Sequence, residues 1–387
     1  MQSPTIAFLV NGEPAGAMGI RARSFEQRLR GDFRIEIAYR EGNKALAIWR
    51  FFLFLVRLRP ALCYVFDMGF SGVIAASLYR PISRCRVVVD TGDAIYELAR
   101  LTGRGRIGLW LTKLLEQLSF SISDRIVVRS HPHQELLDRE GISADVIPDG
   151  VDTTEFFPCV ENELRKQYGL DGVLVVGILG SLIWNSREQT CYGWELIELI
   201  HRVRDQPVKG VIIGDGSGLP KLKALCAAQN LEDRMVFLGR IPYSDLPGYL
   251  NMMDICLSTQ TNDGAGQVRT TGKLPLYLAC GRFVLSSQVG EAARLLPQEM
   301  LVPYDGTKDN EYPAKLEERV RWALQQREPV SPSARSVTLA QANFEYNVLA
   351  ARLRKTLLDL LPARPERPRQ ESLAARESDP VRAADRE

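Results

Sequence analysis

The chain has 387 residues, enough for two domains, and its 45% hydrophobic and 25% charged residues are typical of a folded globular protein. This composition excludes a disordered, collagen-like or coiled-coil chain, and the near balance of 49 Lys or Arg against 47 Asp or Glu excludes bulk binding of nucleic acid. Residues 1–110 alone hold 16 Lys or Arg and only 9 Asp or Glu, so part of the N-terminal half is expected to present a positive face to an anionic membrane surface or an acidic ligand.

The first half of the chain alternates short apolar runs with longer amphipathic stretches. Helices are expected over residues 21–30, 72–79 and 107–120. Strands are expected over residues 5–10, 34–38, 62–66, 86–89, 125–128 and 145–147. Such alternation predicts a parallel, doubly wound sheet covered by helices, and the turn Pro148-Asp149-Gly150 ends this series.

The longest apolar stretch, Ala45 to Val56, is too short to cross a membrane, which requires about 20 apolar residues. One interpretation is a helix buried against the sheet, with Trp49, Phe52 and Leu53 packed on it; the strand expected at 62–66, which follows at once, favours this arrangement. The other interpretation is a basic helix that lies on an anionic bilayer. The cations of this stretch are Lys44, Arg50, Arg57 and Arg59.

A second series of elements follows in the C-terminal half. Strands are expected over residues 174–179, 210–213, 235–238, 255–258 and 283–286, with helices over 194–203 and 221–229 and an amphipathic helix over 344–360. Two Rossmann-like units of similar size, one after the other, predict two domains with a cleft between them. Residues 363–387 contain no aromatic residue and are rich in Arg, Glu and Pro, so we expect a disordered tail there.

A glycine-rich loop over residues 11–20 links the first strand to the first helix. Gly16 and Gly19 would let a ligand approach the backbone, and N–H groups at a helix N-terminus bind phosphate or sugar. We therefore take both glycines as candidate ligand-binding residues, with an ordinary turn as the alternative. The spacing is not GxGxxG and no acidic residue ends the second strand, which argues against a nicotinamide cofactor.

Four segments are much more specific. They are residues 146–158 (VIPDGVDTTEFFP), 214–220 (GDGSGLP), 236–242 (VFLGRIP) and 278–282 (LACGR). In this order they resemble the interdomain segment, the GDG turn, the FLGR block and the ACG block of the retaining nucleotide-sugar glycosyltransferases of family 4. The resemblance covers nearly the whole chain up to residue 361 and is densest from 146 to 291.

The resemblance implies a GT-B fold, an α/β architecture of two Rossmann-like domains that face each other across a cleft. It implies an acceptor-side domain over residues 1–158, a nucleotide-sugar domain over 159–342, and a helix over 343–361 that crosses back to the N-terminal domain. It also implies transfer of a sugar from a nucleoside diphosphate donor with retention at the anomeric carbon. Because no DxD motif follows a strand, we expect no metal, and no cofactor beyond the donor itself.

Candidate donor residues follow from the resemblance and from the chemistry of phosphate binding. Arg187 is a candidate phosphate clamp, while Arg269 and Lys273 would neutralise the leaving diphosphate; a solvated surface position is the alternative for each. The other candidate donor residues are Gly16, Gly19, Gly180, Ser181, Arg240, Ile241, Thr270, Thr271 and Gly272. Arg240 and Ile241 are expected beside the nucleobase, and the others beside phosphate or sugar.

Two residues are candidates on the acceptor side, because both follow strands whose ends face the expected cleft. Asp93 would bind a sugar hydroxyl or the acceptor, and we count it with Arg187 and Lys273 among the catalytic candidates; its alternative is a helix N-cap. His131 is the other, with a plain helix-start residue as its alternative. The acceptor is left open between a glycan, a lipid-linked molecule and a small molecule, and so is the oligomeric state.

The chain departs from the family at one informative point. Family members commonly place two carboxylates eight residues apart, the second on the donor ribose, where this chain has Val268 and Leu276. Leucine accepts no hydrogen bond, so a catalytically weak homologue that acts as a binding subunit is an alternative reading. Another is a different GT-B chemistry, such as a sugar-nucleotide epimerase or a phosphorylase, although no lysine motif indicates the pyridoxal phosphate of a phosphorylase.

The seven cysteines are dispersed and form no CxxC pair, a pattern typical of reduced thiols. The N-terminal apolar run is short and enters a glycine-rich turn, so we expect no signal peptide. Together these features predict a cytoplasmic protein, with peripheral contact to the inner face of the membrane if the basic helix lies on a bilayer.

Overall fold

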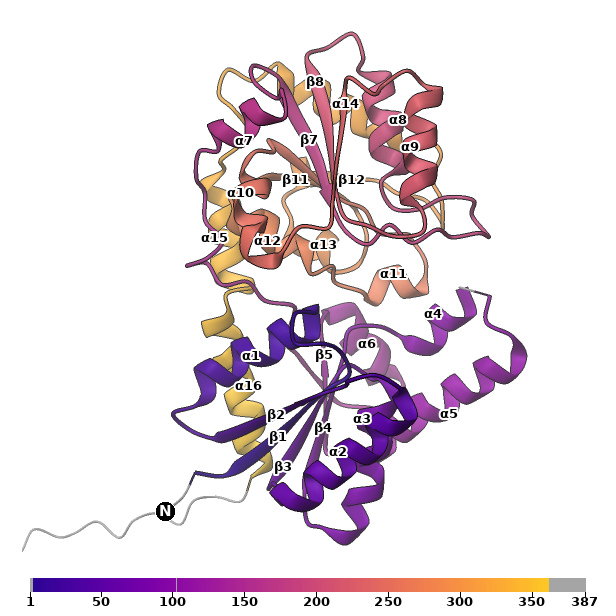
Figure 1. Cartoon of the computed structure of the whole chain (residues 1–387), viewed down its shortest axis with the longest axis vertical. Helices are drawn as coiled ribbons and strands as arrows, with labels where there is room; N and C mark the ends of the chain where they lie inside the picture. The colour runs from indigo at the N-terminus through magenta and orange to yellow at the C-terminus, as the bar shows by residue number, and fades with distance from the viewer. Residues whose placement is uncertain (1–2, 102, 362–387) are drawn as a thin grey trace, which may run out of the picture.

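The computed structural model describes residues 3–101 and 103–361, which form two α/β domains stacked one above the other (Figure 1). The tail expected at residues 363–387 lies outside the described residues. Every strand expected from the sequence forms, and the doubly wound two-domain architecture is confirmed. One further strand of two residues, at the edge of the second sheet, is too short to be recognised from an apolar pattern.

The N-terminal domain is a three-layer α/β unit. Its elements are β1 (Thr5–Val10), α1 (Ala17–Leu29), β2 (Arg34–Tyr39), α2 (Lys44–Leu58), β3 (Leu62–Phe66), α3 (Phe70–Tyr79), η1 (Arg80–Ile82), β4 (Arg86–Thr91), α4 (Ile95–Leu101), α5 (Arg106–Ile122), β5 (Arg125–Val128), α6 (His131–Arg139) and β6 (Ala144–Val146). The strands form one parallel sheet in the order β2-β1-β3-β4-β5-β6. Central strands such as β3 are apolar along their whole length, because helices cover both faces of the sheet.

The C-terminal domain repeats this plan. Its elements are α7 (Asn162–Gln167), β7 (Leu174–Leu179), α8 (Trp194–Arg202), β8 (Val208–Ile213), α9 (Leu219–Ala228), β9 (Met235–Gly239), η2 (Tyr243–Asp245), α10 (Leu246–Asn251), β10 (Ile255–Ser258), α11 (Gly264–Val268), α12 (Lys273–Ala279), β11 (Phe283–Ser287), α13 (Gly290–Leu295), η3 (Gln298–Met300), β12 (Leu301–Val302), α14 (Tyr312–Leu324), α15 (Ala334–Asn343) and α16 (Tyr346–Leu360). The sheet order is β12-β11-β10-β7-β8-β9, again parallel.

The last helix, α16, belongs in space to the N-terminal domain. Its buried residues Leu349, Leu353 and Leu357 join the apolar cluster formed by α1 and one face of the first sheet. The chain crosses back beside the interdomain segment, where the N–H of Val151 donates to the carbonyl of Phe344 over 2.9 Å. Two neighbouring segments of the chain therefore connect the two domains.

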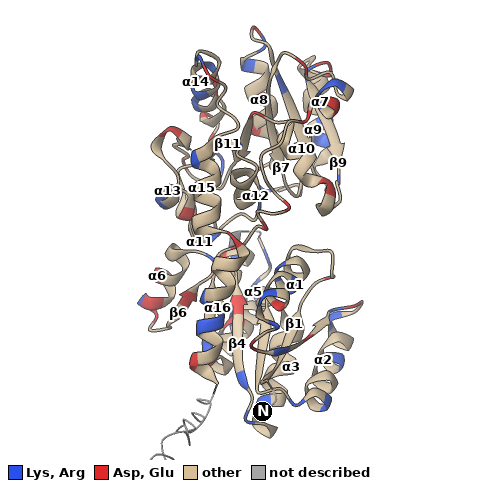
Figure 2. Ribbon diagram, turned by 90° about the vertical axis from the view of Figure 1, so that its left-hand side faces the viewer, with Lys and Arg blue, Asp and Glu red and all other residues tan. Residues whose placement is uncertain are grey.

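Helix α2 covers the opposite face of the first sheet, on the far side of the domain from α16 (Figure 2). Asn43 caps its first turn by accepting from the N–H of Ala45, and its apolar residues at four-residue intervals, Ala47, Phe51 and Leu55, are buried. The expectation that Trp49 and Leu53 pack on the sheet was wrong. Trp49 and Leu53 are exposed and Phe52 is half-buried, because the helix is apolar nearly all round and only one side of it meets the sheet.

No helix in residues 3–101 and 103–361 is long and apolar enough to span a membrane. All seven cysteines lie in this part of the chain and are free, and six of them are buried.

Candidate functional site

Loops from the carboxyl ends of the two sheets meet between the domains, and several candidate residues lie in this contact. Arg269 and Asp93 form an ion pair across it, with Nε of Arg269 2.8 Å from Oδ1 of Asp93. Thr270 donates from Oγ1 to the carbonyl of Arg129 over 2.9 Å, and Ser130 donates from Oγ to the carbonyl of Val268 over 2.5 Å. Segment 268–270 is therefore held against the strand ends of the N-terminal domain.

Lys273 begins α12 just behind this contact. It is half-buried, and its Nζ lies 3.4 Å from the centroid of the Tyr192 ring. Removal from water, partly opposed by the carboxylate of Glu195 and assisted by the charge of Arg269, lowers the pKa of Lys273 to about 7. A Cβ added to Gly180 would lie 3.6 Å from the same nitrogen, so the ammonium stands beside the loop that follows β7.

The GDGSG turn holds this loop by direct backbone contact. A Cβ on Gly214 would lie 1.9 Å from the carbonyl oxygen of Gly180, and Gly214 has a φ of +143°, so only glycine fits here. The N–H of Gly218 donates to the carbonyl of Leu182 over 2.7 Å, and the N–H of Gly214 donates to the carbonyl of Gly239 over 2.8 Å. The ends of β7, β8 and β9 are thereby fixed beside one another.

The remaining donor candidates lie around these strand ends. Ser181 and Arg240 are exposed, and Ile241 is half-buried directly after Arg240. Thr271 shares a hydrogen bond with Ser258 between their hydroxyl oxygens at 3.2 Å, and Gly272 lies close to the carboxylate of Asp149. These positions are compatible with a ligand that lies along the strand ends of the second sheet.

Arg187 has only local contacts among the described residues. It lies in the loop between β7 and α8, where its backbone N–H donates to Oδ1 of Asn185 over 3.0 Å. Its side chain is exposed and forms no ion pair with any described residue. The assignment of Arg187 as a phosphate clamp therefore stays a prediction.

The acceptor-side candidate His131 is engaged by the C-terminal domain. Its backbone N–H donates to Oε2 of Glu291 over 2.8 Å, and its Nδ1 lies 2.8 Å from Oε1 of the same carboxylate. Glu291 is 3% exposed and begins α13 together with Gly290. Glu291 was not anticipated from the sequence, since nothing in its local pattern indicates a partner so distant in the chain.

The glycine-rich loop after β1 is shaped by its own packing. A Cβ on Gly19 would lie 2.2 Å from the carbonyl oxygen of Pro14, so the loop itself requires this glycine. Gly16 is the residue before α1 and is half-buried. The helix that they begin reaches the interdomain contact, because Nη2 of Arg129 lies 2.8 Å from the sulfur of Met18.

A buried ionic cluster that sequence reasoning missed lies beneath this contact. Arg21 is 1% exposed and donates from Nε to Oδ2 of Asp90 over 2.8 Å and from Nη2 to the carbonyl of Ile147 over 2.7 Å. Burial lowers the pKa of Arg129, but the carboxylates of Asp149 and Asp90 more than offset this and leave it raised. The cluster ties α1 and two strand ends to the start of the interdomain segment.

The two family carboxylate positions are both apolar and buried. Val268 is 4% exposed and Leu276 is 6% exposed, and Leu276 packs in the apolar core of the C-terminal domain. Neither side chain can accept a hydrogen bond from a ribose hydroxyl. In the part of the chain that the structure describes, no group of three or more His, Cys, Asp or Glu side chains is placed to hold a metal ion.

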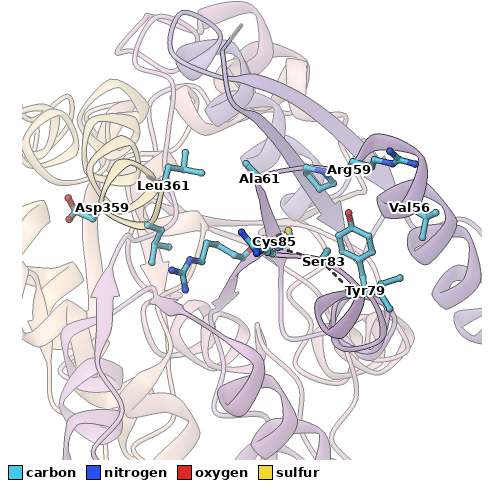
Figure 3. A pocket seen from close by; sticks show the side chains of 13 residues that line it. Val56, Arg59, Ala61, Tyr79, Ser83, Cys85, Asp359 and Leu361 are labelled. Atoms are coloured by element: carbon cyan, nitrogen blue, oxygen red, sulfur yellow. Dashed lines mark hydrogen bonds between the residues drawn. The ribbon is translucent and has the colours of Figure 1, made fainter. Parts of the chain in front are cut away.

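A large cavity lies away from the interdomain contact. It has a volume of about 940 Å³ and opens at the amino ends of the first sheet's strands, between α2, α3 and the end of α16 (Figure 3). Tyr79, Cys85 and Leu361 line it together with the arginines at positions 59, 84 and 86. It is open to solvent, and the candidate residues described above do not line it.

Comparison with known sequences connects the second domain to a family. Residues 174–325 match the family model described as glycosyl transferases group 1. The GPI3 subunit of phosphatidylinositol N-acetylglucosaminyltransferase of Saccharomyces cerevisiae is 24% identical over 219 residues, which are 55% of this chain and 45% of that protein. A GDP-mannose-dependent alpha-(1-6)-phosphatidylinositol monomannoside mannosyltransferase of Mycolicibacterium smegmatis is 31% identical over 42% of this chain and 41% of its own length. The matched regions span less than half of each of these relatives.

Comparison with solved structures shows the fold of the whole described chain. Sucrose-phosphate synthase of Thermosynechococcus elongatus superposes with a TM-score of 0.73 at 17% identity, covering 92% of this chain and 99% of that one. HepE of Anabaena in complex with UDP-glucose superposes with a TM-score of 0.71 at 16% identity and the same coverage. MnaA of S. aureus in complex with UDP gives a TM-score of 0.60 at 13% identity, covering 94% of this chain and 99% of that one. The fold is GT-B, as the sequence led us to expect.

Proposed function

We propose that this chain is a GT-B glycosyltransferase that transfers a sugar from a nucleoside diphosphate sugar to an acceptor. The observation that carries the proposal is the position of Lys273, whose ammonium lies beside the backbone of Gly180 at the strand ends of a domain that matches glycosyl transferases group 1. A structural relative of the same fold is known in complex with UDP-glucose, which supports a nucleotide-sugar donor.

In the proposed reaction the donor diphosphate lies between the loop after β7 and the start of α12. Lys273 and Arg269 would stabilise the negative charge that develops on the departing diphosphate, and this interaction strengthens in the transition state. The bond between the anomeric carbon and the phosphate oxygen breaks, and the acceptor oxygen bonds to that carbon from the same face. The proton of the acceptor hydroxyl passes to the leaving phosphate oxygen. Because the acceptor attacks from the face that the phosphate leaves, the configuration is retained, and the step uses neither a protein nucleophile nor a metal.

The Asp93–Arg269 ion pair would change when the donor binds. Arg269 is 48% exposed and Asp93 is 32% exposed, so the pair is accessible to a competing anion. A phosphate that forms an ion pair with Arg269 would free the Asp93 carboxylate to accept a hydrogen bond from a hydroxyl of the sugar or the acceptor. Donor binding and acceptor recognition would then be coupled through one ion pair between the domains.

The first experiment is a thermal-shift screen with UDP-, GDP-, ADP- and dTDP-sugars, because a ligand that binds only the folded chain raises its melting temperature. The sugar that gives a shift is then tested for nucleotide release with and without acceptors. Lys273→Met should abolish most of the shift and the release. Release by the wild-type chain that is unchanged in Lys273→Met would overturn the assignment of the donor site.

A catalytically weak binding subunit is the second candidate, favoured by the buried Leu276 at the position of the family carboxylate. The yeast relative is itself named as a subunit. Nucleotide release from any donor would reject this candidate. Release from a UDP-sugar without an acceptor, accompanied by an isomerised sugar, would indicate an epimerase instead.

The acceptor that we propose is lipid-linked. The names of the yeast and mycobacterial relatives both contain phosphatidylinositol, which supports this class over a soluble glycan or a small molecule. We further propose that the protein acts in the cytoplasm at the membrane surface.

A further inference from the structure

Helix α2 exposes an apolar stripe to solvent. Leu46 is 58% exposed, Trp49 is 61% exposed and Leu53 is 45% exposed, and their spacing of three and four residues places them on one side of the helix. The opposite side packs on the sheet. The stripe therefore points away from the sheet and toward solvent.

Helix α5 exposes a second stripe of the same kind. The exposed fraction is 78% for Ile107, 61% for Trp110, 46% for Leu111 and 42% for Leu114. With α4 this helix forms an arm that extends outward from the N-terminal domain (Figure 1). Two exposed tryptophans with aliphatic neighbours are unusual on a solvated surface, because contiguous apolar patches mark interaction sites.

The sequence around both stripes is mainly basic. Residues 42–66 and residues 103–115 contain no Asp or Glu. Their exposed cations are Lys44, Arg50, Arg57, Arg59, Arg104, Arg106 and Lys113. Acidic residues adjoin both ranges: the carboxylate of Glu41 lies 3.6 Å from Arg50, Asp67 follows the first range, and Glu116 of α5 accepts from the backbone N–H of Tyr96. A surface that joins exposed Trp and Leu to exposed Lys and Arg complements anionic headgroups above an acyl layer.

The fold places both stripes toward the same end of the domain. Helices α2, α3 and α5 pack on one face of the sheet, with α3 between the other two. In a doubly wound sheet such helices begin near the carboxyl ends of the strands, and both stripes lie in the first two-thirds of their helices. Ser71 near the start of α3 donates to the carbonyl of Lys44 at the start of α2 over 2.9 Å. The stripes thus flank the end of the domain that carries Asp93.

We propose that the exposed sides of α2 and α5 form a docking surface for an anionic lipid bilayer. The tryptophan and leucine side chains enter the boundary between headgroups and acyl chains, and the cations pair with lipid phosphates and carboxylates. The surface itself requires no enzymatic activity. Its consequence, delivery of a lipid-linked acceptor to the interdomain contact, rests on the proposed function.

The test is co-sedimentation of the purified full chain with vesicles of phosphatidylcholine that contain phosphatidylserine, compared with vesicles of phosphatidylcholine alone. Binding is expected only with the anionic vesicles and is expected to weaken as salt rises, because the cations act through screened charge. Trp49→Ser combined with Trp110→Ser should reduce binding by at least about tenfold through lost apolar burial. A variant that combines Lys44→Gln, Arg50→Gln, Arg106→Gln and Lys113→Gln should bind about 100-fold more weakly or worse.

A matched control comes from the C-terminal domain. Val160→Ser removes an apolar side chain that is 82% exposed, and Lys166→Gln removes an exposed cation of α7. Neither change should alter vesicle binding. Circular dichroism of every variant checks that the fold is kept, and all the substituted side chains are exposed, so loss of binding would report on the surface.

Three results would overturn the docking surface: no binding to anionic vesicles even at low salt, binding that is unchanged in the tryptophan variant, or a dimer in solution that the tryptophan variant dissociates. Nucleotide release from a soluble donor is measured in parallel. Vesicle binding that fails while nucleotide release persists rejects the surface and leaves the proposed function standing. Vesicle binding that persists while no donor gives nucleotide release rejects the proposed function and leaves the docking surface standing.

Discussion

The ammonium nitrogen of Lys273 lies 3.4 Å from the centroid of the Tyr192 ring, which comes from the loop before α8. An aromatic face attracts a cation through its quadrupole and brings no negative charge of its own. Lys273 is therefore positioned without a direct ion pair to any residue that the structure describes, while the buried carboxylate of Glu195 acts on it from a greater distance. Such an ammonium is ready to pair with an anion that enters beside Gly180.

This geometry predicts that diphosphate affinity depends on pH. The pKa of free Lys273 is about 7, below its ordinary value of 10.5, so the lysine loses its charge as pH rises above 7. A bound diphosphate favours the charged form, so binding takes up a proton and the affinity falls by up to about 50-fold between pH 7 and pH 9. Calorimetric titration of UDP and GDP measures this. In Lys273→Arg, which stays charged, the curve should be nearly flat; a flat wild-type curve would contradict the prediction.

The ion pair between Asp93 and Arg269 predicts an effect on turnover without an effect on stability. Both side chains are partly exposed, so the pair contributes less than about 1 kcal/mol to folding. Arg269→Ala should lower kcat by about 10²–10³ through lost charge stabilisation, while the melting temperature stays nearly unchanged. Arg294 is the matched control, because it is equally exposed and also pairs across the domains, with Glu135 at 2.7 Å. If Arg294→Ala lowers kcat as much, Arg269 has no special part in the reaction.

The strands could be predicted because their sequences leave little choice. Runs such as residues 62–66 and 174–179 are continuously apolar and short, which is typical of strands buried on both faces of a parallel sheet. Helix α2 shows the limit of this reasoning. Its sequence is apolar on nearly every side, so periodicity could not decide whether Trp49 or Phe51 meets the sheet. The structure decides it, because the sheet contacts only the side that carries Phe51.

The site could be predicted only as far as local motifs reach. Arg269 and Lys273 follow from a loop with small residues and two cations, but their partners Asp93 and Tyr192 come from distant loops. Arg21 was missed because a charged residue within a helix is ordinarily solvated, whereas here carbonyls of the interdomain segment accept from its guanidinium. Such partners depend on tertiary packing, which no local pattern records.

The GDGSG turn predicts a sharp stability difference between two glycines. Gly214→Ala should destabilise the chain by at least about 1–3 kcal/mol, because the added Cβ would lie 1.9 Å from the Gly180 carbonyl at a φ of +143°. At Gly31 a Cβ meets nothing within 4 Å, so Gly31→Ala should be nearly neutral. Denaturant unfolding measures both changes. Equal stability of the two variants would show that the turn does not pack on the loop after β7 as described.

Helix α16 predicts a contrast between two adjacent leucines. Leu357 is fully buried against the N-terminal domain, whereas Leu358 is 39% exposed on the same helix. Leu357→Ala should lower the free energy of unfolding by about 2–5 kcal/mol, since it removes buried methyl groups and leaves a cavity. Leu358→Ala should change it by about 0.5 kcal/mol or less, because alanine also suits a helix and little surface is buried. Urea unfolding of both variants, followed by circular dichroism, tests this contrast. Equal losses would mean that α16 does not bind the N-terminal domain through the side that carries Leu357.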